Sequence, residues 1–139
     1  MTPDDLARLH AAAFDMPPPW PARAFEQLLA LPGTFLIARD GAFALGRVVL
    51  DESELLTLAV APPLRRRGLG RTCLIAYEQG ARQRGATLSH LEVAADNGPA
   101  IALYGARGYR QTGRRPGYYR GADGRPRDAV LMARGLIAR

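Results

Sequence analysis

The chain has 139 residues, of which 47% are hydrophobic, which is enough sequence for one domain with its own buried core. Its single cysteine, Cys73, excludes an internal disulfide framework and a zinc site built from cysteines. The two histidines, His10 and His90, lack metal-ligand spacing. No apolar run approaches the roughly 20 residues of a membrane helix, and the first residues are acidic, unlike a signal peptide. We therefore expect one soluble cytoplasmic domain over 1–139, with no bound metal and no membrane partner.

The basic residues are all arginine: 19 Arg stand against 13 Asp and Glu, which gives a formal net charge of +6. The absence of lysine excludes Schiff-base catalysis and a phosphate-binding P-loop. Residues 1–64 hold 4 Arg and 8 acidic residues, 65–100 hold 6 and 3, and 101–139 hold 9 and 2, so the positive charge belongs to the second half. This pattern is typical either of a protein that binds an anion, such as a phosphorylated cofactor or RNA, or of a solvated arginine-rich surface.

Two short helices are predicted first, followed by three strands. Thr2 has the context of a helix N-cap, with Asp5 three residues later and apolar residues at helical spacing. The proline-rich stretch 15–21 is predicted to be a stiff loop. The other elements predicted in this half are a helix at 21–30, strands at 34–39 and 42–50 joined by an Asp-Gly hairpin turn, and a strand at 54–60.

Strands and helices alternate in the second half. The predicted elements are a loop at 61–67, a helix at 68–84, a strand at 89–94, a helix at 99–107, a strand at 109–114, a loop at 115–128 and a last strand at 129–133. Cys73 falls on the apolar stripe of the longer helix, and we expect it to pack in the core. The fold class is therefore α/β (α+β), with a mixed, mostly antiparallel sheet flanked by helices.

A glycine- and arginine-rich segment opens the helix at 68–84. Glycine lets the backbone approach a ligand closely, the first N–H groups of a helix have no intrahelical partner, and the helix dipole attracts anions. The segment is therefore predicted to hold a pyrophosphate, the alternative being a plain turn with exposed arginines. A dinucleotide-binding fold is excluded, because its third glycine position is Cys73 and the chain is too short.

Three further residues are candidates for chemistry. Glu92 alternates away from its apolar neighbours on the strand 89–94, and it is either a general base or a partner of one of the many arginines. Asn97 precedes the helix at 99–107, where it fits a helix cap. Tyr104 on that helix either packs or donates a proton to a leaving group.

These residues, in this order, resemble the GCN5-related N-acetyltransferase (GNAT) family. Val60-x4-Arg65-x-x-Gly68-x-Gly70 matches the family's (Q/R)-x-x-G-x-(G/A) signature for the pyrophosphate of acetyl-CoA, and the strand at 54–60 and the segments around Glu92 and Tyr104 keep the family's order. The chain is most similar to the RimI-type subgroup, the ribosomal-protein-alanine N-acetyltransferases. The features shared with that subgroup are Phe14, Pro19-Trp20, Phe25, Thr57-Leu58-Ala59-Val60, Tyr118-Tyr119 and Asp123-Gly124.

The resemblance implies a GNAT-like acyl-CoA N-acyltransferase fold whose two central strands splay apart. It departs from the family in one respect, because the first helix begins almost at Met1 and the family's first strand is expected to be absent or supplied otherwise. It implies Glu92 as the base and Tyr104 as the acid toward the departing CoA thiolate. The residues that it implies for binding acetyl-CoA are Leu58, Ala59, Val60, Arg65, Arg66, Arg67, Gly68, Leu69, Gly70, Arg71 and Asn97.

The predicted function is transfer of the acetyl group of acetyl-CoA to the N-terminal α-amine of a protein, such as a ribosomal protein. Trp20 and the loop of Tyr118 and Tyr119 are predicted to contact the acceptor, the alternative being that they only cover the end of the sheet. Acidic residues of the first half, such as Glu26, Asp51 or Glu52, are candidates for favouring a basic second residue in the acceptor. Two other functions remain open: acetylation of a small-molecule amine, and a non-enzymatic RNA- or ribosome-binding module. Contact with nucleic acid is compatible with the charge but not required by it.

Overall fold

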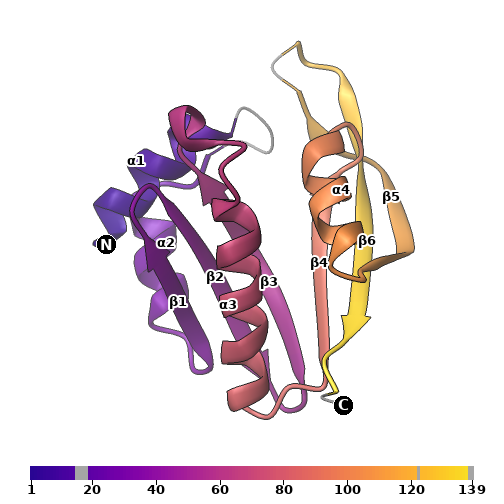
Figure 1. The fold of residues 1–139 in the computed structure, drawn as a ribbon. Coiled ribbons are helices and arrows are strands. Elements are labelled where there is room, and N and C mark those ends of the chain that lie inside the picture. Colours follow the sequence, from indigo (N-terminus) through magenta and orange to yellow (C-terminus); the bar gives the residue numbers. More distant parts are fainter. Residues whose placement is uncertain (15–18, 122, 138–139) are drawn as a thin grey trace.

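The computed structural model describes residues 1–14, 19–121 and 123–137 (Figure 1). Part of the predicted proline-rich loop, 15–18, therefore lies outside the described residues. The elements in chain order are α1 (Pro3–Ala13), α2 (Ala22–Leu29), β1 (Thr34–Arg39), β2 (Ala42–Val49), β3 (Glu52–Val60), a 3₁₀ turn (Pro62–Leu64), α3 (Leu69–Gln83), β4 (Leu88–Ala94), α4 (Gly98–Ala106), β5 (Arg110–Arg120) and β6 (Pro126–Gly135).

Local sequence signals set several of these boundaries. The Thr2 side chain accepts a hydrogen bond from the Asp5 N–H, and the Asp5 carboxylate accepts one from the Thr2 N–H, which completes the predicted capping box of α1. Gly85 follows α3 with a φ of +89°, a left-handed conformation that glycine adopts without strain. Both helix ends are therefore determined by residues that the sequence alone identifies.

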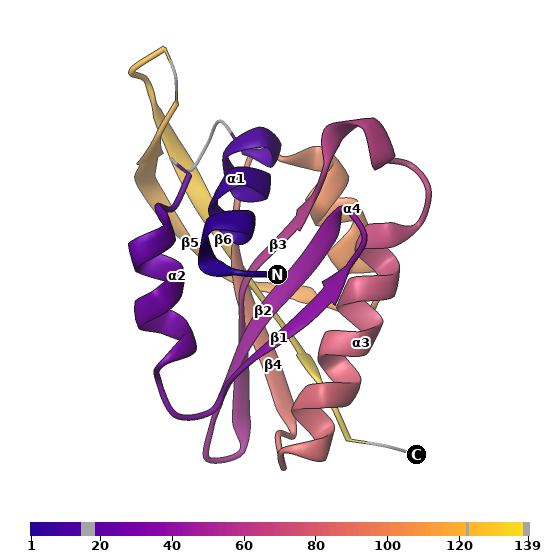
Figure 2. The same cartoon turned by 90° about the vertical axis from the view of Figure 1, so that its left-hand side faces the viewer.

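The six strands form one sheet in the order β1-β2-β3-β4-β6-β5, in which every neighbouring pair is antiparallel except β3 and β4. Figure 2 shows α1 and α2 on one face of the sheet and α3 on the other. The predicted mixed, mostly antiparallel sheet flanked by helices is confirmed. Within the described residues no strand precedes α1, and none of the helices there is long and apolar enough to cross a membrane.

Each face of the sheet has its own core. Leu6, Phe25 and Phe43 centre the cluster beneath α1 and α2. Cys73 and Tyr77 of α3 belong to a larger cluster on the opposite face, so the predicted core position of Cys73 is confirmed. Because the two cores are separate, the two faces can carry different chemistry where the sheet opens.

The predicted loop at 115–128 is wrong. β5 continues to Arg120 and β6 begins at Pro126, so most of this segment is a hairpin that extends the sheet (Figure 1). The sequence hides these strands because both faces of the hairpin are exposed and show no alternation of apolar and polar residues. The register shifts between Arg115 and Tyr119, where a proline and a glycine interrupt regular pairing. The third strand also begins two residues earlier than predicted, at Glu52.

The pairing of β3 with β4 stops early. Only Glu52, Ser53 and Glu54 have partners on β4, and beyond them the two strands diverge (Figure 1). A buried hydroxyl cluster holds the strands at the point of divergence: the Tyr77 hydroxyl lies 2.9 Å from Ser53 Oγ and 2.8 Å from Ser89 Oγ. Since Ser53 and Ser89 face each other across the ladder, this cluster fixes where the sheet begins to open.

Candidate functional site

The gap between β3 and β4 joins two cavities. The larger has a volume of about 760 Å³ and is bounded by the 65–71 segment and by α4. The smaller, of about 360 Å³, lies toward α1 and the β5–β6 hairpin. The residues that line both cavities are Phe14, Leu58, Ala94, Asn97, Ala100 and Leu103. The two spaces therefore meet where the central strands diverge.

The larger cavity collects the residues predicted to bind acetyl-CoA. All of them except Arg67 line its wall, and Arg67 is exposed outside it. Arg65 donates a hydrogen bond to the carbonyl of Ala13 at 2.8 Å, which ties the segment to the end of α1. The structure thus brings the end of β3 and the start of α3 around one space.

The backbone of this segment is shaped for an anion. Arg66 has a φ of +66° and Gly68 one of +79°, and no side chain caps the N-terminus of α3. Consecutive residues that alternate between left-handed and right-handed backbone conformations turn their N–H groups toward one point. The N–H groups of an uncapped helix start attract negative charge. Arg66 is one of two non-glycine residues described with positive φ, a conformation that concentrates at functional sites.

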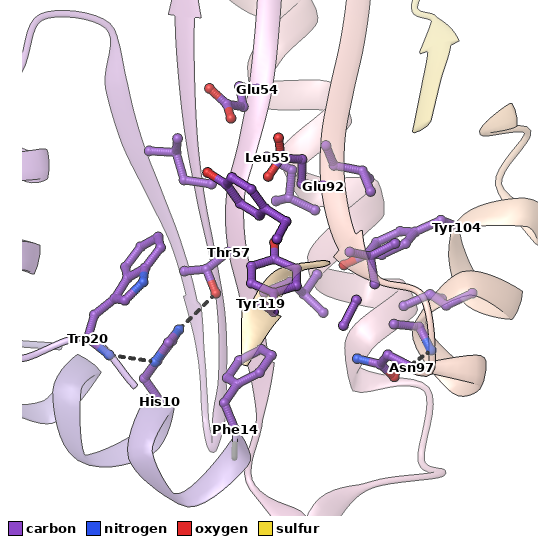
Figure 3. A pocket seen from close by; sticks show the side chains of 18 residues that line it. His10, Phe14, Trp20, Glu54, Leu55, Thr57, Glu92, Asn97, Tyr104 and Tyr119 are labelled. Carbon is purple, nitrogen blue, oxygen red and sulfur yellow. Dashed lines mark hydrogen bonds between the residues drawn. The ribbon is translucent and has the colours of Figure 1, made fainter. Parts of the chain in front are cut away.

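The smaller cavity gathers side chains from distant parts of the chain. Figure 3 shows His10, Trp20, Thr57, Glu92 and Tyr119 around it. Tyr118 also lines the wall, so the structure brings together all three residues predicted to contact the acceptor. The predicted loop carrying the two tyrosines is corrected to a strand, since both lie on β5.

A β-bulge decides which way β3 presents its side chains. In the pairing with β2, Leu45 faces Thr57 and Gly46 faces Leu55, which leaves Leu56 as an extra residue. Before the bulge, Ser53 points to Tyr77 of α3. After it, Thr57 points to His10 of α1, on the opposite face. Without the extra residue these two odd-numbered positions would share a face.

Glu92 faces the smaller cavity. Its neighbours Leu91 and Val93 are buried in the core beneath α3, so strand alternation turns the carboxylate to the other side. Glu92 Oε1 lies 3.0 Å from the Nε of Arg115, and its side chain is 24% exposed. Burial, together with the negative charge of Glu92, raises the pKa of Tyr119 to about 12. The pairing with an arginine, one of the two alternatives for Glu92, is therefore observed, and the carboxylate also lies in the wall of a cavity.

Tyr104 and Asn97 approach the gap from α4. Tyr104 is buried, and burial raises the pKa of its phenol well above the ordinary value, so the phenol keeps its proton at neutral pH. Asn97 Oδ1 accepts a hydrogen bond from the Ala100 N–H at 3.3 Å, which confirms the predicted helix cap. Asn97 lines both cavities.

Two cavity residues were missed by the sequence analysis. His10 is 1% exposed, stacks on Trp20 with ring centroids 5.1 Å apart, and has a pKa lowered to about 4 by burial. The available signal was a polar residue on the apolar stripe of the first helix. Glu54 lies in the wall, whereas the acidic candidates Glu26, Asp51 and Glu52 do not.

Comparison with known proteins identifies the family. The model named "Acetyltransferase (GNAT) family" matches residues 4–109. The chain belongs to the GNAT family. This GNAT chain is 39% identical over 123 residues to the [Ribosomal protein bS18]-alanine N-acetyltransferase of Escherichia coli K12, covering 83% of this chain and 80% of the relative. It is 38% identical over 128 residues to N-alpha-acetyltransferase RimI of Mycobacterium tuberculosis, covering 84% and 79%.

A solved structure supports the same family. The crystal structure of the ribosomal-protein-S18-alanine N-acetyltransferase from Escherichia coli superimposes with a TM-score of 0.84 and 33% identity, covering 96% of this chain and 86% of the other. The GNAT fold implied by the resemblance is confirmed, and the chain is an N-acetyltransferase. Enzymes of this family take acetyl-CoA as their cosubstrate. Among the described residues no group of three or more His, Cys, Asp or Glu is arranged to hold a metal ion.

The position of Gly70 allows a direct test of the larger cavity. A Cβ at Gly70 would lie 3.4 Å from the Leu103 side chain, which is ordinary contact, so a valine there fills the space in front of α3 without striking the backbone. We expect Gly70→Val to weaken CoA binding at least about 10-fold, and more than Arg66→Ala, because backbone groups make most of the anion site. Isothermal titration with CoA measures both. Gly105→Val is the matched control, since a Cβ at Gly105 of α4 meets open space; an undiminished CoA affinity in Gly70→Val would contradict the assignment.

The buried His10 predicts a pH dependence of stability. Its pKa is about 4 in the folded chain and about 6.5 when exposed, so between these values the unfolded chain binds a proton that the folded chain does not. The free energy of unfolding should therefore fall, by up to about 3 kcal/mol, as the pH drops from about 6.5 to about 4. Urea unfolding at a series of pH values checks this against His10→Gln, in which the part of the slope due to His10 should vanish. An equal slope in both proteins would show that other groups carry it.

Proposed function

We propose that acetyl-CoA occupies the larger cavity and that the smaller cavity receives the acceptor amine. The observation that carries this assignment is that the two cavities meet at the divergence of β3 and β4. The residues fit the cofactor: the start of α3 and Arg66 suit its pyrophosphate, and the unpaired edge of β3 beyond Glu54 offers backbone groups to the amides of the pantetheine arm. Acetyl-CoA supplies an acetyl group activated as a thioester.

The acceptor we propose is the α-amine of a protein N-terminus, with an N-terminal alanine of a ribosomal protein as the favoured target. The Escherichia coli enzyme that carries that activity in its name matches both in sequence, at 39% identity, and in structure, at a TM-score of 0.84. The smaller cavity suits a peptide, because Trp20, Tyr118 and Tyr119 provide a rigid aromatic wall along an extended chain. Glu54 and Glu92 give it two carboxylates for an ammonium group or a basic side chain.

Glu92 acts as the base in this proposal. An α-amine has a pKa near 7.7–8.0, so most acceptor molecules arrive protonated at neutral pH and must lose a proton before they attack. The Glu92 carboxylate accepts that proton, directly or through one water. Arg115, whose Nε lies 3.0 Å from Glu92 Oε1, orients the carboxylate.

Tyr104 acts on the leaving group. Its phenol, protonated because burial raises its pKa, donates a hydrogen bond to the departing sulfur. Since a thiol is a much stronger acid than this phenol, the phenol stabilises the thiolate mainly as a hydrogen-bond donor. Glu92 lies on β4 and Tyr104 on α4, and both residues line the smaller cavity beside the gap between β3 and β4.

Substitution of each residue tests these roles. Glu92→Gln should lower kcat about 100-fold and leave CoA affinity unchanged, because it removes the base but retains the shape. Tyr104→Phe should lower the same constant about 10-fold or more, because it removes the donor to sulfur. Thiol release with steady-state kinetics measures both, and Glu26→Gln on the exposed face of α2 is the control for Glu92→Gln. Wild-type turnover in both variants would show that Glu92 and Tyr104 do not take part in the reaction.

The acceptor class is tested by competing substrates. A peptide that begins Ala-Arg should give a higher kcat/KM in the thiol-release assay than free polyamines or aminoglycosides, and the same peptide blocked by N-acetylation should give no turnover. Trp20→Ala and Tyr119→Ala should raise the peptide KM while sparing CoA binding, because both residues line only the smaller cavity.

Acetylation of a small-molecule amine is the second candidate. A structure of a nourseothricin acetyltransferase matches with a TM-score of 0.65 and 27% identity over 76% of this chain. If free amines are acetylated better than every peptide tried, this candidate replaces the first. The non-enzymatic alternative is set aside by membership of the acetyltransferase family.

A further inference from the structure

A chain of hydrogen bonds runs through His10 into the smaller cavity. The backbone N–H of Trp20 donates to His10 Nδ1 at 3.1 Å, and His10 Nε2 lies 3.2 Å from Thr57 Oγ1 (Figure 3). His10 is 1% exposed and Thr57 is 9% exposed, so these hydrogen bonds are largely screened from solvent. The proposed chemistry does not use His10.

The hydrogen bond from Trp20 to His10 determines which atom donates in the hydrogen bond between His10 and Thr57. An N–H can only donate, so His10 Nδ1 is an acceptor and carries no hydrogen. Because a neutral imidazole has one N–H, the hydrogen lies on Nε2 and is donated to Thr57 Oγ1. The Thr57 hydroxyl, having accepted from His10, must direct its own hydrogen elsewhere. Among the described residues Thr57 Oγ1 makes no hydrogen bond other than the one with His10.

The position of Thr57 indicates what receives this hydrogen. Thr57 lines the smaller cavity but not the larger one, although the next three residues of β3 line the larger. The bulge at Leu56 is what turns Thr57 to this face. The hydroxyl therefore serves the acceptor rather than the cofactor. It is a donor. An ammonium group has no acceptor atom, and the neutral amine needs its lone pair for the attack, so the partner of the hydroxyl on a peptide N-terminus is a carbonyl oxygen.

We infer that Thr57 is a specificity-determining residue whose hydroxyl, oriented by His10, donates a hydrogen bond to the first carbonyl oxygen of the acceptor peptide. This inference rests on the proposed function and adds a criterion to it. A peptide N-terminus has a carbonyl next to its α-amine, whereas a polyamine does not. A donor fixed in advance favours ligands with that acceptor, because it is already held in place when the ligand arrives.

The test combines a change in the enzyme with a change in the substrate. The enzyme variant is Thr57→Val, which removes the hydroxyl and keeps the shape. The substrates are a peptide beginning Ala-Arg and its E-alkene isostere, in which the first amide, and with it the carbonyl oxygen, is replaced. With the wild type, the isostere should have a KM about 5-fold to 10-fold higher than the peptide. With Thr57→Val the two KM values should become equal, while kcat for the peptide stays within about 2-fold.

The controls separate a lost contact from a damaged fold. Thr34→Val makes the same chemical change on β1, where Thr34 Oγ1 is buried without a hydrogen-bond partner among the described residues. This variant should keep the wild-type ratio of the isostere KM to the peptide KM. If Thr57→Val does not fold, Thr57→Ser and Thr57→Ala replace it, with serine keeping the ratio and alanine abolishing it. His10→Phe should lower the ratio part of the way, because the hydroxyl persists but is no longer oriented. A purely structural role for His10 would raise both KM values equally.

The outcomes distinguish this inference from the proposed function. If the peptide is acetylated but Thr57→Val keeps the full discrimination between peptide and isostere, the inference is overturned and the proposed function stands. Equal increases in both KM values would also overturn it. If the wild type acetylates no peptide, the proposed function fails and the inference fails with it.

Discussion

Three residue pairs hold β3 to β4, and this short ladder is the constraint on which the rest of the molecule depends. A parallel pair in the middle of a six-stranded sheet would normally continue to the strand ends and leave no space between its members. Here the Tyr77 hydroxyl lies between Ser53 and Ser89, the pair before the last one, and beyond Glu54 and His90 β4 pairs only with β6. The sheet therefore behaves as two halves joined at one end, with an opening that reaches both faces.

The opening has functional value because the faces of the sheet differ. α3 brings an uncapped helix start and arginines to one side, where Tyr104 of α4 is buried in the core, although Tyr104 also lines the smaller cavity. α1, the segment just before α2, and β5 bring aromatic rings to the other, where Glu92 also points. The bulge at Leu56 adds Thr57 to that second side and leaves Leu58 lining both cavities. One extra residue in a strand thus divides neighbouring side chains between cofactor and acceptor.

Much of the arginine surplus is used within the fold. Glu78 of α3 is fully buried and pairs with Arg107 at the end of α4 and with Arg134 of β6, which connects three elements of the core. A buried carboxylate without partners would be strongly unfavourable, so these two arginines are structural. On the hairpin, Arg114 pairs with Asp128 and Arg127 with Asp96. The basic second half therefore does not by itself indicate a polyanion partner.

The sequence by itself determined the class of fold, the capping of α1 and α4, the glycine-rich segment at the start of α3 and the alternation that separates Glu92 from its apolar neighbours. These features depend on residues a few positions apart, and so local patterns report them. The β5–β6 hairpin, the partnership of His10 with Thr57, and the place of Glu54 in the cavity were decided only by the tertiary structure. His10 and Thr57 are 47 positions apart in the sequence. The bulge in β3 changes which face its following side chains point to, and so turns Thr57 toward His10. Packing between distant segments creates that contact. The sequence could not predict it, because no local pattern indicates which face of β3 meets α1.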